Sequence, residues 1–411
     1  MSSTTRTAAS KAGTGLRNHI PLSGPATREP CDGTESPMRV SLGFTPKWYR
    51  DRLGTDFGEA WHLDPFYRYE QSVRMRQLLE ELFPTVDYFR LRMREGSSDG
   101  RPAAGGRLVA SSSGSFCPEC ATISSVYGIM LVSSCYGLQL TYREDNWPDA
   151  FGGIHLDKET LTDLIARGPF DFSRPDVIAR SLPGGGPTIM ALFGQMDEIA
   201  KRWGPIHGYL NYQGILNIAL KLRGNDIFTD MYDDTEFVKG LFDHIARTIG
   251  DLSKTVQARQ RASGFDIDLL SMSNCVMNMV SPLQYEEFVL PLDRRLSGGY
   301  ARFGVHTCNW VIDPYAESLR KIDKMDYIDT GIGSDLARLK HRFPDTRRAV
   351  LYTPGEAESR SLAEIHADLK RIAREYAPCD IVLADVETTM PDTRINDFLA
   401  MAKELEGLVD D

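Results

Sequence analysis

Residues 301–310 have the sequence ARFGVHTCNW, in which a short β-rich run ends at two side chains able to bind metal, His306 and Cys308. Further short apolar runs occur in the C-terminal half, separated by longer stretches with apolar residues at helical spacing. The predicted strands are 206–212, 267–272, 302–307, 325–330, 349–353 and 380–384. The main predicted helices are 235–261, 282–297, 314–322 and 362–376.

This alternation predicts parallel strands joined by crossover helices. Two architectures satisfy it, an open doubly wound sheet and a closed eight-stranded barrel. No G-x-G-x-x-G motif follows any of the runs, which disfavours a dinucleotide-binding sheet. The chain has 411 residues, a length that fits a barrel with an N-terminal addition. We therefore predict an α/β fold, a (β/α)8 TIM-like barrel with an N-terminal helical extension.

The N-terminal half contains segments of low complexity. Residues 1–38 are rich in Ser, Thr, Gly and Pro, so we expect a disordered tail, with residues 39–411 forming one barrel domain. Flexible loops are expected at 95–115 and at 183–187, which contains three consecutive glycines. The uncharged segment 120–142 is too polar for a transmembrane span. We predict a buried helix over 122–133 and a strand near 137–142.

Charge and cysteine usage restrict the partners and the compartment. The net charge is −10 and no basic block is present, so we expect no nucleic-acid partner. Seven cysteines at irregular spacing argue against a disulfide framework and for a reducing compartment. The N-terminus has no apolar core of a secretory signal. We expect a cytoplasmic protein without a membrane partner, and leave open whether it forms a homodimer.

Polar residues recur where the predicted strands end. In a barrel of this kind the active site gathers at the C-terminal ends of the strands. The residues at these ends are Asn211, Tyr212, Asn274, Cys275, His306, Cys308, Asp329, Thr353, Asp385 and Glu387. Among them we expect catalytic roles for Asn211, Tyr212, Asn274 and Asp329.

His306 and Cys308 are two residues apart, and such residues point to the same side of an extended chain. Imidazole and thiolate groups are the usual ligands of zinc, so the pair predicts a metal site. Two ligands are too few, and other strand ends must supply the rest. The candidates are Glu387, Asp329, Cys275 and Cys379.

Two smaller features have less specific interpretations. Cys117 and Cys120 form a single C-x-x-C, which is a weak signal for a metal or redox site because no second pair accompanies it. Aromatic residues gather between 48 and 69, and we expect them to pack a helical cap on the barrel. Stacking on a flat substrate ring is the alternative for this cluster.

The chain resembles the uroporphyrinogen decarboxylase-like superfamily, and within it the zinc-dependent, corrinoid-linked methyltransferase branch. The resemblance runs from about residue 44 to residue 405 and depends on the order of several loose motifs. These are 134–148 (SCYGLQLTYREDNWP), 226–234 (DIFTDMYDD), 281–294 (SPLQYEEFVLPLDR), 306–309 (HTCN) and 390–398 (MPDTRINDF). The fourth of them resembles the H-x-C-G zinc motif of the methyltransferase branch.

The chain departs from this family at the third zinc ligand. In the methyltransferase branch that ligand, usually a cysteine, lies shortly before a closing proline. Here Glu387 stands at about that place relative to Pro391. The resemblance thus implies a site of His306, Cys308 and Glu387 with one open position, and Asp329 as the fallback for the third ligand. The arginine-rich motif of the decarboxylase branch has no counterpart around residues 45–50.

The activity that the resemblance implies is metal (zinc)-dependent transfer of a methyl group between a small-molecule heteroatom and a corrinoid. The corrinoid, a cobalamin, would be carried by a separate protein, since the chain has no D-x-H-x-x-G motif. Glycines at 105–106 and 184–186 would give the loops near the mouth the mobility to admit it. The alternatives are a decarboxylase acting on a small carboxylate and a non-catalytic ligand-binding barrel.

Overall fold

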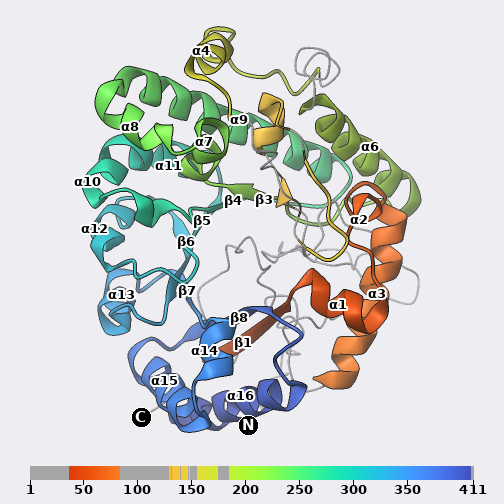
Figure 1. The fold of residues 1–411 in the computed structure, drawn as a ribbon, viewed down its shortest axis with the longest axis vertical. Coiled ribbons are helices and arrows are strands. Elements are labelled where there is room, and N and C mark those ends of the chain that lie inside the picture. Colours follow the sequence, from red (N-terminus) through yellow and green to blue (C-terminus); the bar gives the residue numbers. More distant parts are fainter. Residues whose placement is uncertain are drawn as a thin grey trace, which may run out of the picture.

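A computed structural model describes residues 37–83, 129–130, 132–138, 140–146, 148, 155–174 and 185–408. Eight parallel strands lie in the order β1-β8-β7-β6-β5-β4-β3-β2 around the centre of the molecule (Figure 1). They are β1 Met38–Phe44, β2 Ile129–Met130, β3 Asn211–Gln213, β4 Leu269–Ser273, β5 Arg302–His306, β6 Met325–Gly331, β7 Arg347–Leu351 and β8 Cys379–Val386.

The first strand pairs with the last, as a barrel requires: Met38 lies opposite Cys379 and Leu42 opposite Leu383. Pairing between β1 and β2 is not among the strand pairs of the described residues. The predicted (β/α)8 TIM-like barrel fold is confirmed. The strands are almost continuously buried, since β4 has the sequence LLSMS and buries all five residues. Such runs are typical of parallel strands with helices on their outer face.

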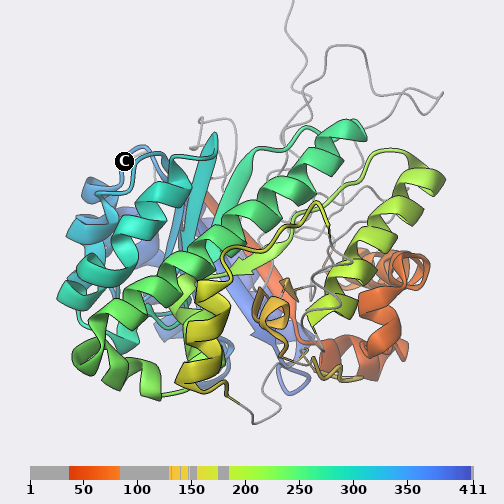
Figure 2. The same cartoon turned by 90° about the horizontal axis from the view of Figure 1, so that it is seen from above.

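Helices lie outside the strands in both views (Figures 1 and 2). In the N-terminal part they are α1 Pro46–Leu53, α2 Glu59–Leu63, α3 Pro65–Leu82, α4 Lys158–Ala166 and α6 Gly185–Trp203. Between β3 and β5 they are α7 Ile215–Arg223, α8 Asp226–Asp233, α9 Thr235–Ala262, α10 Pro282–Gln284 and α11 Leu290–Ser297. The remaining helices are α12 Ala316–Leu319, α13 Leu336–Arg342, α14 Pro354–Ser359, α15 Leu362–Glu375 and α16 Asp392–Leu405.

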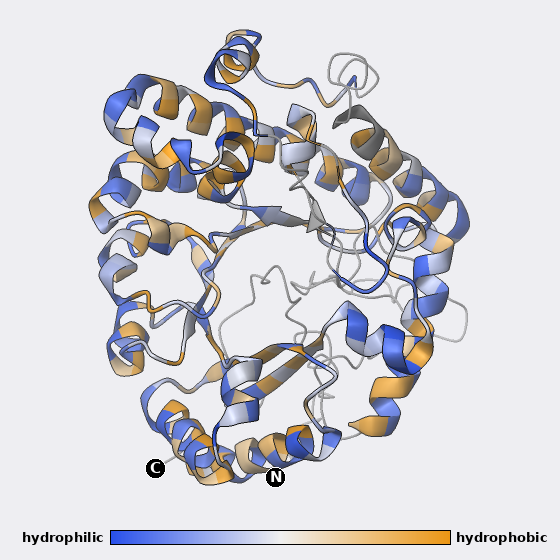
Figure 3. Ribbon diagram, in the orientation of Figure 1, coloured by the Kyte–Doolittle hydropathy of each residue, from blue (hydrophilic) through white to orange (hydrophobic). Residues whose placement is uncertain are grey.

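The local sequence explains where a helix such as α15 begins and which of its faces is buried. At α15 the Ser361 side chain accepts from the Glu364 amide, and the Glu364 carboxylate accepts from Ser361, which forms a capping box. The same helix buries Ile365, Leu369 and Ile372, which recur at helical spacing. Helices around the ring carry both hydrophobic and hydrophilic residues (Figure 3). This amphipathic pattern lets helices such as α15 bury one face while the other meets solvent.

The N-terminal helical extension packs around aromatic residues. Trp48, Tyr49, Phe57 and Trp61 have no exposed surface. The Phe44 and Trp48 rings lie 4.0 Å apart between centroids, and the rings of Phe57 and Trp61 lie 4.7 Å apart. These four side chains therefore serve as core, as the sequence favoured. None of the helices in the described part of the chain combines the length and apolar character that crossing a bilayer requires.

Three sequence expectations need correction. The helix predicted over 122–133 is wrong at Ile129–Met130, which form β2 and pair with β3, whereas Val132 and Ser133 lie in a short 3-10 helix, Val132–Tyr136. Of the residues predicted as a strand at 137–142, the described ones, 137–138 and 140–142, form no regular strand. A short apolar run does not distinguish a strand from a helix until its pairing partner is known. Of the loop predicted at 183–187, residues 185–187 begin α6, where a proline is tolerated in the first turn.

Other expectations fall outside the described residues. These are the loop at 95–115, Cys117 with Cys120, and the tail up to residue 36. The end of the predicted tail is displaced, however, because Met38 begins β1 and is buried. The carbonyl of Pro37 also accepts a hydrogen bond from the Cys379 amide. Pro37 and Met38 therefore belong to the barrel and not to the tail.

A buried ion pair joins β7 to β8 at the N-terminal end of the barrel. Arg347 donates from Nε to Oδ2 of Asp380 at 2.8 Å and from Nη2 to Oδ1 at 2.6 Å. Neither side chain is exposed to solvent. The two opposite charges are joined by two hydrogen bonds, which compensate for their removal from water. Their position at the end opposite the strand C-termini indicates a role in stability, not in chemistry.

We predict that Asp380→Ala lowers the free energy of unfolding by about 3–5 kcal/mol, because it removes the buried carboxylate to which the Arg347 guanidinium donates two hydrogen bonds. Urea denaturation monitored by tryptophan fluorescence would measure this. The control is Asp51→Ala, which removes one partner of the exposed Lys47–Asp51 pair and should leave the unfolding midpoint unchanged. Equal effects of the two substitutions would contradict the prediction.

Candidate metal centre

Cys275, His306 and Cys308 form a group whose ligand atoms all lie within 4.8 Å of one another. Two adjacent strands bring them together. β4 and β5 are paired in parallel, with Ser273 opposite His306. Cys275 follows the end of β4 by two residues, and Cys308 follows the end of β5 by two residues. The group therefore lies at the C-terminal ends of the strands, where barrels of this kind hold their active sites.

The turn after β5 places Cys308 beside His306. The Cys308 sulfur lies 3.1 Å from Nε2 of His306. The backbone of Cys308 has a φ of 62°, in the left-handed region, so extended geometry does not explain the proximity of the two side chains. A side chain other than glycine in this region costs of order 1–3 kcal/mol, and such strain is common at functional sites. The sequence thus predicted the pairing correctly but through the wrong backbone geometry.

Packing against β6 holds this strained turn. A Cβ atom on Gly331 would lie 1.9 Å from the carbonyl oxygen of Asn309, so only glycine fits at this point of contact. The Gly331 amide donates to the Trp310 carbonyl at 2.9 Å. The end of β6 therefore supports the loop that carries Cys308.

Asp329, on β6, orients His306. Its Oδ2 lies 2.5 Å from His306 Nδ1, and its Oδ1 accepts from the Thr307 amide at 2.6 Å. The Tyr327 hydroxyl also donates to Oδ2 at 3.2 Å. Because Nδ1 is engaged with this carboxylate, Nε2 is left to face the sulfur of Cys308 and a metal. This carboxylate–histidine arrangement commonly fixes the ring of a metal-binding histidine.

The surroundings of His306 favour the protonated, positively charged form of its imidazole. Burial by itself lowers the pKa of the imidazole, but the Asp329 carboxylate and the thiol groups of Cys308 and Cys275 outweigh this and raise the pKa well above its ordinary value. A divalent cation at Nε2 would supply the positive charge that these neighbours attract. The site is therefore suited to a cation.

The two cysteines share a hydrogen bond. The Cys308 thiol and the nearby His306 hold the pKa of Cys275 well below its ordinary range. Donation of that hydrogen bond and burial raise the pKa of Cys308. A metal ion that displaced the protons of both thiols would bind the two sulfurs as thiolates.

Glu387, the predicted third ligand, is not a member of the group of three. Its Oε2 accepts a hydrogen bond from the Thr45 hydroxyl at 3.2 Å. Asp385, two residues before Glu387, interacts electrostatically with His306 and Cys275. Its partial desolvation and the negative Glu387 raise the pKa of Asp385 to about 6, while the positive His306 acts against the rise. The metal role of Glu387 stays a prediction, now in competition with Cys275.

Asp329 and Tyr212, two of the four residues predicted to be catalytic, are buried. Asp329 is fully buried and has the orienting position described above. Tyr212 is also buried, with its ring 5.9 Å from that of Tyr209, and burial raises the pKa of its hydroxyl well above the usual value. Asn211 lies in β3, and its side chain is not among those described. The catalytic roles of the four residues stay predictions.

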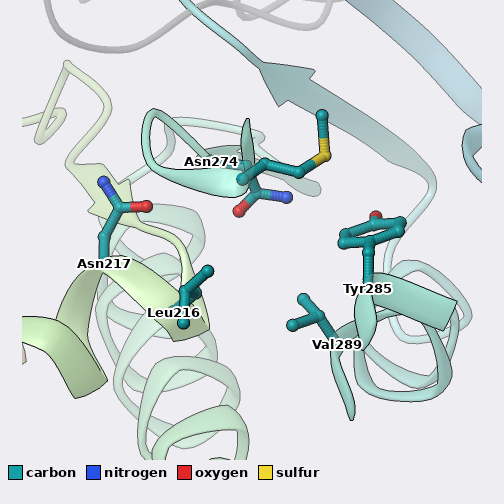
Figure 4. A pocket seen from close by; sticks show the side chains of 6 residues that line it. Leu216, Asn217, Asn274, Tyr285 and Val289 are labelled. Carbon is teal, nitrogen blue, oxygen red and sulfur yellow. The ribbon is translucent and has the colours of Figure 1, made fainter. Parts of the chain in front are cut away.

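Asn274 has a structural position as well. Its side-chain amide donates to buried Asp293 at 3.2 Å, and Tyr285 donates to the same carboxylate oxygen at 2.8 Å. Desolvation raises the pKa of Asp293 to about 7, although both hydrogen bonds act in the opposite direction. A small recess beside Asn274 is lined also by Leu216 and Val289 (Figure 4). It has no room for a water molecule, so it is not a substrate pocket.

The sequence analysis did not single out Trp310, which touches the metal group. Its indole N–H donates to the carbonyl oxygen of Cys275 at 2.7 Å. One feature of the sequence could have indicated it: a tryptophan two positions after Cys308, in a predicted loop where no large aromatic side chain is needed to fill the core. Cys275 was among the candidates for the third ligand, but nothing in the sequence ranked it above Glu387.

Comparison with known proteins supports the fold. No family model matches the sequence, and no curated protein matches it. A methyltransferase from Methanosarcina mazei superimposes with a TM-score of 0.55 over 91% of this chain and 95% of that chain, at 13% identity. A B12-independent methionine synthase from Shewanella sp. W3-18-1 gives a TM-score of 0.34 over 50% of this chain and 63% of that chain, at 14% identity. The first match shows a shared fold, and the second is too weak to add to it.

We predict that Asp329→Asn weakens zinc binding about ten- to hundred-fold, because a neutral amide orients His306 less firmly than a carboxylate does. Competition titration against a zinc chelator would measure the affinity. Asp335→Asn, in the next loop, is the matched control, since Asp335 is an exposed helix cap that asparagine can replace. Unchanged zinc affinity in Asp329→Asn would show that the carboxylate does not act on the metal centre.

Proposed function

We propose that the protein is a zinc-dependent methyltransferase whose metal is held by Cys275, His306 and Cys308. The observation that carries this proposal is the convergence of one imidazole and two thiols at the C-terminal ends of β4 and β5. Two cysteines and a histidine are a known ligand set of catalytic zinc, and they leave a fourth position for a substrate. The proposal replaces Glu387, expected from the resemblance, by a cysteine from another strand.

The separations within the group fit the size of the ion. Zinc bonds of about 2.3 Å to sulfur and 2.0–2.1 Å to nitrogen imply ligand atoms roughly 3.3–3.8 Å apart in a tetrahedron. His306 Nε2 and the Cys308 sulfur lie 3.1 Å apart, and every pair in the group lies within 4.8 Å. Side-chain movements of about 1 Å would therefore suffice. Thiolate ligands also persist best in a reducing compartment, which agrees with the proposed cytoplasmic location.

When bound, the ion supplies Lewis acidity that lowers the pKa of a coordinated heteroatom in the substrate. The chain itself supplies the remaining parts. Asp329 retains the proton on Nδ1 and so directs Nε2 toward the metal, and the two thiols become ligands by losing their protons. A heteroatom that enters the fourth position would then be ready to give or accept a methyl group.

We further propose that the other reactant is a corrinoid on a separate protein. The given sequence has no corrinoid-binding motif of its own, and its resemblance is to the corrinoid-linked branch. A decarboxylase acting on a carboxylate finds less support. Asp385 places negative charge near His306 and Cys275, and such charge repels a carboxylate substrate.

We predict about one zinc per chain in the wild-type protein, measured by elemental analysis after removal of loosely bound metal. Cys275→Ser, His306→Ala and Cys308→Ser should each lose most of it, because two ligands bind zinc weakly. Glu387→Gln should retain it. The control for the cysteine substitutions is Cys379→Ser, at the start of β8. Loss of zinc in Glu387→Gln with full zinc in Cys275→Ser would restore Glu387 as the third ligand.

We predict that the zinc-loaded protein forms methylcobalamin when it is given reduced cobalamin, in the cobalt(I) state, and a methyl ether or thioether. Absorbance spectroscopy would follow the product over time. Cys308→Ser should reduce the rate at least about a hundred-fold, since removing a group essential to catalysis typically costs that much or more. Release of carbon dioxide from a carboxylate substrate without cobalamin would overturn the methyltransferase proposal.

A further inference from the structure

Trp310 connects the two loops that carry the cysteines of the metal centre. It lies two residues beyond Cys308, in the loop after β5, while Cys275 lies in the loop after β4. The bond from the indole N–H to the Cys275 carbonyl, at 2.7 Å, crosses between them. Trp310 is 42% exposed. Since a large aromatic ring gains most from full burial, packing alone does not account for its place.

Two hydrogen bonds tie the backbone around Cys275 to residues 306–310, the segment that carries the other two ligands. The amide of Asn274, the residue before Cys275, donates to the carbonyl of His306 at 2.7 Å. The carbonyl of Cys275 itself accepts from the indole N–H of Trp310. The first of these bonds continues the parallel ladder between β4 and β5. The second comes from a side chain beyond the end of the ladder, so a substitution can remove it without disturbing the sheet.

Trp310 is itself anchored to β6. Its carbonyl accepts from the Gly331 amide at 2.9 Å and from the Thr330 hydroxyl at 3.2 Å. The same strand carries Asp329, which orients His306. The end of β6 thus fixes the imidazole through one contact and, through Trp310, reaches the backbone of Cys275.

We propose that Trp310 is a positioning residue of the metal centre, whose indole N–H holds Cys275 at metal-binding distance from His306 and Cys308. This inference rests on the proposed function, because it concerns the same three ligands. Cys275 lies beyond the end of a regular strand, and a shift of about 1 Å in such a ligand is enough to impair a metal site. Groups that orient metal ligands typically contribute ten- to hundred-fold in affinity.

The exposed face of Trp310 could instead serve only as an apolar wall for a substrate. Phenylalanine at position 310 separates the two roles, because it keeps an aromatic face and removes the N–H donor. A wall would leave the affinity for a bare metal ion unchanged, whereas a positioning residue would not.

The experiment is a titration of metal-free protein with Co²⁺, followed by the thiolate-to-cobalt absorption in the near ultraviolet. Wild-type protein should bind and develop this absorption. Trp310→Phe should bind about ten-fold more weakly. In a Cys275→Ser background the same substitution should cause no further loss, since the residue acts through Cys275. Val311→Ala, at the exposed neighbouring position, is the control and should bind as the wild type does.

Several results would overturn the inference. Wild-type affinity in Trp310→Phe would do so, as would a ten-fold loss that persists in the Cys275→Ser background, because that would indicate a general structural effect. If the wild-type protein itself takes up no Co²⁺, the proposed metal centre fails together with this inference. If the wild type binds and Trp310→Phe binds equally well, the inference fails alone.

Discussion

The hydrogen bond between His306 and the buried carboxylate of Asp329 is the contact on which the rest of the site depends. A fully buried carboxylate is costly unless it is paired and hydrogen-bonded, and Asp329 accepts from His306, Thr307 and Tyr327. The bond fixes one ring nitrogen and so decides which nitrogen faces the thiols. It also joins the ends of β5 and β6, the two strands that support the strained turn at Cys308.

From this contact the geometry of the centre extends across three neighbouring strands. β6 supplies the orienting carboxylate and the glycine on which the turn after β5 packs. β5 supplies His306 and Cys308, and β4 supplies Cys275 through a loop held by Trp310. Parallel pairing is what makes this possible, because it brings the carboxyl ends of all three strands to one edge. His306 therefore comes from a strand, Cys308 from a strained turn, and Cys275 from a loop that a hydrogen bond from Trp310 holds in place.

The buried polar groups of the barrel have distinct roles. The Arg347–Asp380 pair lies at the opposite end of the barrel and holds β7 to β8. Asn274, Tyr285 and Asp293 form a network behind Cys275 and leave no space for a ligand. Only the group of Cys275, His306 and Cys308 combines metal-binding atoms with a partly accessible position among the described residues. Metal-assisted methyl transfer is the function that we propose for this group.

The sequence by itself determined the alternation of strands and helices and hence the barrel, because apolar periodicity and capping residues act over a few positions. It also determined that His306 and Cys308 would lie together, since neighbours in the chain cannot separate far. It could not decide between Cys275 and Glu387, which lie 31 residues before and 81 residues after His306. Nor could it show that Asp329 faces the imidazole, or that Trp310 reaches across to Cys275. Only the tertiary structure places Cys275 beside His306 and Cys308, Asp329 against the imidazole and Trp310 on the Cys275 carbonyl. Strand register and loop packing, which no local pattern encodes, bring these distant groups together.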